Sequence, residues 1–139
     1  MKNSGNHKGH TLYAEAHRYY KNAKDTLRRS PIKGNAYQDM KYVQEACGTA
    51  YLAVLNALNG YLVERGMDPK KLPDSIEEYH AAFKKYLVHN GKVKGALSNV
   101  YEILHVFGYY KGFSTVDVVK IGFEKAKFLI EHLTRQKLG

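Results

Sequence analysis

Residues 35–65 contain no proline, and their apolar residues recur at intervals of three and four. This spacing places side chains on one face of an α-helix. Small residues beside that face would allow neighbouring helices to approach closely. The segment predicts a central helix that begins at an N-cap, Asn35, and ends before Gly66. Its predicted inward face holds Met40, Val43, Cys47, Ala50, Tyr51, Val54, Leu58 and Leu62.

Segments with the same periodicity lie on both sides of this helix. Prolines and glycines separate them, and Ser75 followed by Glu78 forms a capping box, which is a signature of a helix start. A short turn is expected at Gly108 and Gly112. These features predict an all-α fold, an antiparallel bundle of four to five helices. The predicted helices cover about residues 11–30, 35–65, 75–88, 92–107 and 114–133.

The chain has 139 residues, a length that suits one compact domain. We assign residues 11–136 to a single helical-bundle domain and residues 1–10 to a disordered basic tail. The start of the chain lacks the hydrophobic core of a signal peptide, and no run of about 18 apolar residues indicates a transmembrane helix. We therefore expect no membrane association and a cytoplasmic location. The single cysteine, Cys47, is predicted to be a buried structural thiol.

Basic residues outnumber acidic ones, and the formal net charge is +9. Residues 1–35 carry eight Lys or Arg against two acids, and residues 92–139 carry eight against four. The middle of the chain is near neutral. This charge is compatible with a nucleic acid or another anionic partner. Because the basic residues are spread along the helices without a dense arm, a soluble basic surface explains them equally well.

The sequence lacks the glycine-rich motifs of phosphate-binding loops and the His-Glu-x-x-His motif of zinc proteases. Glu102 with His105, and Glu77 with His80, match the Glu-x-x-His spacing of ferritin-like di-iron proteins. The two further carboxylates that such a site needs are not available on the predicted inward faces. We therefore expect no metal and no cofactor.

Several stretches resemble parts of a known superfamily. These are "YYKNAKDTL" at 19–27, "QEACGTAYLAVLNALNGYLVERG" at 44–66, His80, and "HVFGYYKGFSTVDVVKIGFEKAKFLIEHL" at 105–133. Together they resemble the HEPN superfamily, small helical-bundle domains of prokaryotic nucleotide-binding and RNA-targeting proteins. The resemblance spans about residues 12–133. It implies a helical bundle that pairs into a homodimer.

The nuclease members of that superfamily carry an arginine followed, after four to six residues, by a histidine. Here Asn99 and His105 lie at a comparable place, but Ser98 occupies the arginine position. RNA cleavage needs a cation to stabilise the charge on the phosphorane and a group that moves the proton. Serine cannot supply the cation. The resemblance therefore implies a branch without nuclease activity, unless a lysine such as Lys94 or Lys111 replaces the arginine.

Polar side chains recur every three or four residues beside the apolar face of the fourth helix. One interpretation is a solvated face on which Glu102 and His105 form an i, i+3 pair. A second is a binding surface at a cleft or dimer groove, and a third is a catalytic site with His105 as the candidate residue. The candidate binding residues are Ser98, Asn99, Tyr101, Glu102, His105 and Tyr109.

From these features we predict a non-catalytic, HEPN-like binding or interaction module that forms a homodimer. A nucleotide, an RNA and a partner protein are the candidate ligands. The first alternative is a diverged, metal-independent endoribonuclease that uses His105. The second is a purely structural homodimeric bundle.

Overall fold

The computed structural model describes residues 4–87 and 90–139. It confirms the predicted all-α fold: five α-helices make up the bundle, and the described strands form only a small two-stranded sheet. A 3-10 turn at Pro69–Lys71 lies in the loop after the second helix, and a π-helical segment precedes the last one. The helices are α1 Ser4–Leu27, α2 Met40–Glu64, α3 Ile76–Tyr86, α4 Gly91–Val100 and α5 Val116–Thr134, with strands β1 Ile32–Lys33 and β2 Ala36–Tyr37.

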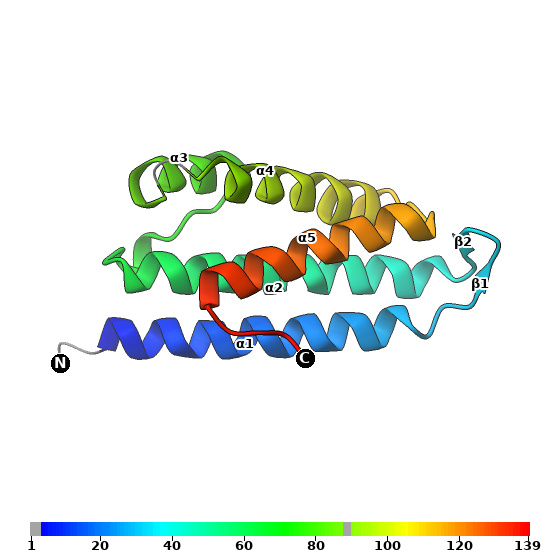
Figure 1. The fold of residues 1–139 in the computed structure, drawn as a ribbon, viewed down its shortest axis with the longest axis horizontal. Coiled ribbons are helices and arrows are strands. Elements are labelled where there is room, and N and C mark those ends of the chain that lie inside the picture. The colour runs from blue at the N-terminus through cyan, green and yellow to red at the C-terminus, as the bar shows by residue number, and fades with distance from the viewer. Residues whose placement is uncertain (1–3, 88–89) are drawn as a thin grey trace.

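The helices pack in layers on the two sides of α2. Figure 1 shows α1 running antiparallel along one side of α2, with α3 and α4 on the opposite side and α5 crossing α2 obliquely. In the structure α2 contacts α1, α5 and the π-helical segment, and α4 contacts α5. The core therefore surrounds α2, as the periodicity of residues 35–65 predicts.

α2 is the longest of the described helices, with 25 residues. Every residue of its predicted inward face is buried except Met40, which is half-buried against the core. Among the described helices, α2 alone is long and apolar enough to cross a membrane, with a mean hydropathy of 1.2 over 18 residues. However, 67% of that window is buried inside the bundle, which is typical of the core helix of a soluble protein.

The first helix begins at Ser4, so residues 4–10 are helical where the sequence predicted a disordered tail. The extra turns pack against the end of α2. A Cβ atom added to Gly60 would lie 2.9 Å from the carbonyl oxygen of Gly9, so these two glycines allow a close crossing. Tyr13 donates a hydrogen bond of 2.7 Å to Glu64. The close glycine contact was not considered in the prediction from periodicity.

α2 begins at Met40, five residues after the predicted N-cap. Asp39 caps it instead, since its carboxylate accepts a hydrogen bond from the backbone N–H of Lys41 at 3.1 Å. The residues before it form the β1–β2 hairpin, whose turn contains Gly34 with a positive φ of 62°. This hairpin is anchored to the loop before α5 by the bond from the Tyr37 N–H to the Ser114 carbonyl.

The predicted capping box opens α3. The Ser75 hydroxyl accepts a bond of 3.1 Å from the backbone N–H of Glu78, while the Glu78 carboxylate accepts one from the N–H of Asp74.

α4 begins after Asn90, whose side chain accepts a hydrogen bond from the Val93 N–H. The predicted end of the third helix, at residues 89–91, lies partly outside the described residues.

The helical hydrogen-bonding pattern changes after Val100, where α4 ends. Tyr101–Tyr110 is a π-helix, and the bond from the Lys111 N–H to the Val106 carbonyl has its i to i−5 spacing. Gly108, predicted to form a turn, lies inside this segment and is buried against Cys47 of α2. Gly112, with a φ of 67°, makes the turn instead.

Cys47 is fully buried, as predicted, and burial raises the pKa of its thiol to about 12. A thiol that stays protonated at neutral pH is a poor nucleophile. This supports its interpretation as a packing residue.

The contact of Gly108 with Cys47 leaves no room for a methyl group. A Cβ atom added to Gly108 would lie 2.5 Å from the Cys47 sulfur. We therefore expect Gly108→Ala to lower the free energy of unfolding by about 1–3 kcal/mol. Gly95→Ala, where an added Cβ meets nothing within 4 Å, is the matched control and should be neutral or stabilising. Urea denaturation of both variants tests this, and equal stability of the two would contradict it.

Candidate functional site

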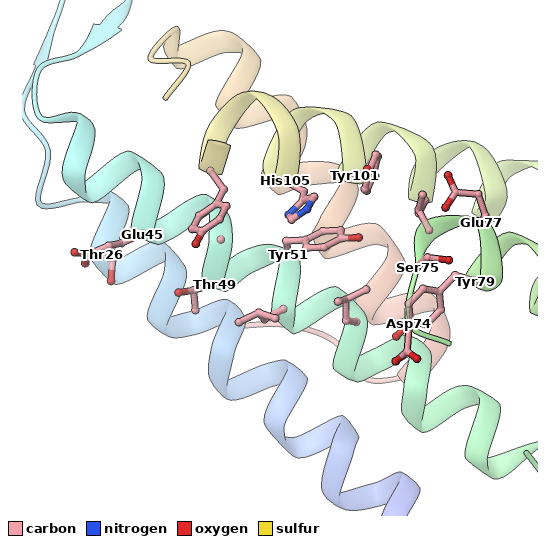
Figure 2. A pocket seen from close by; sticks show the side chains of 15 residues that line it. Thr26, Glu45, Thr49, Tyr51, Asp74, Ser75, Glu77, Tyr79, Tyr101 and His105 are labelled. Carbon is pink, nitrogen blue, oxygen red and sulfur yellow. The ribbon is translucent and has the colours of Figure 1, made fainter. Parts of the chain in front are cut away.

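A groove with a volume of about 700 Å³ opens on the surface of the bundle. It lies between α2, the start of α3 and the π-helical segment, with one residue from the end of α1 (Figure 2). We call it the aromatic groove. Its lining residues are Thr26, Glu45, Gly48, Thr49, Tyr51, Leu52, Leu55, Asp74, Ser75, Ile76, Glu77, Tyr79, Tyr101, His105 and Tyr109.

His105 lies at the centre of a cluster of aromatic rings. Its imidazole stacks on Tyr51, with ring centroids 4.6 Å apart and planes inclined by 23°. Tyr101 lies at 5.3 Å, and Tyr109 is nearly parallel at 6.1 Å. Tyr110 meets the same imidazole edge-on at 5.0 Å. Such pairs contribute about 0.5–1.5 kcal/mol each beyond burial, so the cluster holds the imidazole in one orientation.

This environment alters the acid–base properties of the cluster. Desolvation lowers the pKa of His105 below its usual value of 6.5. Burial also raises the pKa of Tyr51, with smaller contributions from Tyr79 and Tyr101. At neutral pH the His105 imidazole and the Tyr51 phenol are therefore uncharged. The floor of the groove offers π faces and a few hydrogen-bonding atoms rather than charge.

The spacing of Tyr101, His105 and Tyr109 in the π-helix explains why these rings share a face. With i to i+5 bonding, residues four and five positions apart lie above one another, and Tyr101, His105 and Tyr109 follow at intervals of four. Gly48 of α2 lets the Tyr109 ring approach, because an added Cβ would lie 2.8 Å from that ring. The Gln44 side chain donates to the Tyr109 carbonyl at 3.2 Å and holds the end of the segment.

The rim of the groove is acidic. Glu45 stands at one end, and Asp74 and Glu77 stand at the other (Figure 2). Within the described residues, none of these three carboxylates has an ion-pair partner, and no Lys or Arg lines the groove. The charge around the groove is thus opposite in sign to the net charge of +9. An anion would be repelled here.

The structure brings together three of the six predicted binding residues. Tyr101, His105 and Tyr109 line the groove. Ser98, Asn99 and Glu102 do not; all three are exposed, and the Ser98 hydroxyl lies 3.3 Å from the His80 ring nitrogen. The prediction assumed 3.6 residues per turn, and the π-helix turns Glu102 away from the groove.

The other wall of the groove was not predicted as a site. Tyr51 was assigned to the core, and its ring is indeed buried, but one side forms the floor of the groove. Glu45 and the residues around the α3 start, Asp74 to Glu77, come from segments far apart in sequence. The one signal for them in the sequence is the near-neutral charge of the middle segment, where acidic residues are as frequent as basic ones. Among residues 4–87 and 90–139 there is no cluster of three His, Cys, Asp or Glu that could hold a metal ion.

The chain belongs to the family described as "Domain of unknown function (DUF5618)", which matches residues 11–135. It is also similar to a solved structure of a protein of unknown function from Dyadobacter fermentans. The two are 33% identical, the match covers 91% of this chain and 96% of that chain, and the TM-score is 0.76. No curated protein matches the chain.

The lowered pKa of His105 can be measured directly. We expect its imidazole to titrate below 6.5 in an NMR pH series, because burial desolvates the ring and disfavours its charged form. Relative to the unfolded chain, the neutral ring contributes stability above pH 6.5, and this contribution is lost as the pH falls through the lowered pKa. Tyr110→Ala removes an exposed ring from the cluster and should raise the midpoint. A midpoint at or above 6.5 in the native protein would contradict the burial of this ring.

Proposed function

We propose that the protein is a non-catalytic, HEPN-like binding module whose ligand lies in the aromatic groove. The observation that carries the proposal is the stack of His105 on Tyr51 inside a hollow of about 700 Å³. Ligand sites are typically concave, mostly apolar and fitted with a few polar groups, and the groove has these features. The helical-bundle fold supports the HEPN-like part of the proposal.

The charge of the groove favours some of the candidate ligands over others. Glu45, Asp74 and Glu77 would repel the phosphates of a nucleotide or an RNA, and no basic side chain among the described lining residues offsets them. The basic residues of the chain lie elsewhere. A neutral or cationic ligand therefore fits this groove better than an anionic one.

The endoribonuclease alternative finds little support in the same geometry. His105 could accept a proton, since its pKa is lowered by desolvation. Neither Lys94 nor Lys111 lines the groove, however, and the Lys111 ammonium lies 5.9 Å from the Phe107 ring. Without a cation beside His105, the charge that develops on a phosphorane would not be stabilised.

Titration with an uncharged aromatic probe tests the proposal. Indole should shift the aromatic resonances of Tyr51, Tyr101 and His105, whereas adenosine monophosphate at the same concentration should shift them less. A short RNA should remain intact after incubation with the protein. Tyr109→Ala should weaken indole binding about threefold to tenfold through loss of ring contact. Ile121→Ala, which shortens an apolar side chain of similar exposure outside the groove lining, is the matched control.

Two outcomes would contradict the proposal. If millimolar indole leaves all the groove resonances unmoved, the groove is not a binding site. If RNA is cleaved with multiple turnovers and His105→Ala abolishes the cleavage, the protein is an enzyme.

A homodimer remains part of the proposal, and an apolar patch at one end of the bundle supports it. Tyr110 is 68% exposed, Ile32 56% and Phe113 40%. Ile32 belongs to the β1–β2 hairpin, which is hydrogen-bonded to the loop before α5 that holds Phe113. Large apolar side chains that cluster on a surface mark interaction sites more often than isolated ones do.

We expect light scattering at tens of micromolar to give twice the mass of one chain. Tyr110→Ser should shift the equilibrium toward the monomer, since it removes the most exposed ring of the patch. Ile121→Ser changes an apolar side chain of similar exposure, 46%, outside the patch and should leave the mass unchanged. A monomeric mass for the native protein over this concentration range would rule out the dimer and its purely structural version.

A further inference from the structure

We infer that the aromatic groove binds a linear polyamine, whose ammonium groups contact the carboxylates at the two ends of the groove and whose methylene chain lies over the tyrosine rings. The inference rests on the proposed function and adds the chemical class of the ligand. It follows from the distribution of charge, the nature of the floor and the length of the groove.

The charges stand at opposite ends of the groove. Figure 2 shows Glu45 beside Thr26 and Thr49 at one end, and Asp74 and Glu77 beside Ser75 at the other. All three carboxylates are exposed, and none has an ion-pair partner within the described residues. A ligand with a positive charge at each end would therefore find an acceptor at both ends.

The floor between these ends is aromatic and uncharged. Tyr51, Tyr101 and Tyr109 surround His105, with ring centroids between 4.6 and 6.1 Å from it or from one another. The faces of tyrosine rings attract ammonium groups and also pack against methylene groups. Because desolvation keeps the imidazole neutral at pH 7, the floor does not repel a cation.

The length of the groove favours an extended ligand over a compact amine. Glu45 and Leu55 both line it and are ten residues apart on α2, which corresponds to about 15 Å along the helix axis. A single ammonium group could contact only one end. A chain of methylene groups with three or four amines can reach carboxylates at both ends without a bend.

The positive charge of the remaining surface favours binding in the groove over adsorption elsewhere. With a net charge of +9, most of the surface repels polycations. Weak adsorption of a polyamine over the whole surface is therefore disfavoured, and binding at the groove should appear as one saturable site per chain.

Spermidine is the probe that tests the inference, with binding measured by calorimetry and by the aromatic resonances of the full-length protein. We expect one site per chain and shifts confined to the groove. Glu45→Gln and Glu77→Gln should each weaken binding about threefold to fivefold, because each removes an exposed charge contact. Glu102→Gln is the matched control, since Glu102 is exposed but lies outside the lining, and should leave the affinity unchanged. The uncharged 1,8-octanediol should bind much more weakly than spermidine.

The outcomes separate this inference from the proposed function. If indole binds in the groove and spermidine does not, the binding module stands and the polyamine inference is wrong. The same holds if Glu45→Gln and Glu77→Gln leave the spermidine affinity unchanged. If neither probe perturbs the groove residues, both proposals are wrong.

Discussion

The close packing of the π-helical segment against α2 is the contact on which the groove depends. Gly108 rests on Cys47, and Gly48 accommodates the Tyr109 ring, so the two backbones approach where larger side chains would hold them apart. This approach presses His105 onto Tyr51. Tyr101, His105 and Tyr109 follow at intervals of four, so the segment presents their three rings on the face that meets α2. π-helical turns often occur at functional sites, and here the π-helical segment carries three of the rings that line the groove.

Acidic residues line the groove, whereas the protein as a whole carries a net positive charge. The acids of the groove come from the middle of the chain, where residues 36–91 hold six Lys or Arg against seven Asp or Glu. A net charge of +9 on its own suggests an anionic partner, but the local field at a site depends on the side chains that line it. The acidic rim therefore says more about the charge of the ligand than the net charge of the protein does.

The sequence predicted the helices well because their apolar residues repeat with a constant period. It placed the α2 core and the Ser75 cap correctly. It missed the first turns of α1, which depend on the contact of Gly9 with Gly60, and the hairpin before α2, which depends on a bond to Ser114. Three of its six candidate site residues line the groove. Ser98 and Glu102 were included because a period of 3.6 was assumed, and Asn99 because of the resemblance to the nuclease motif. Tyr51 and Glu45 join the site only through tertiary packing.

The contact between His105 and Tyr51 is the element that most needs direct observation. An isotope-edited NOESY spectrum of the unliganded protein measures it without any assumption about the ligand. Ring centroids 4.6 Å apart predict strong cross-peaks between the imidazole protons of His105 and the ring protons of Tyr51. If those cross-peaks are absent while the core resonances are well dispersed, the π-helical segment does not pack on α2 in this way. The aromatic groove, and both proposals built on it, would then be wrong.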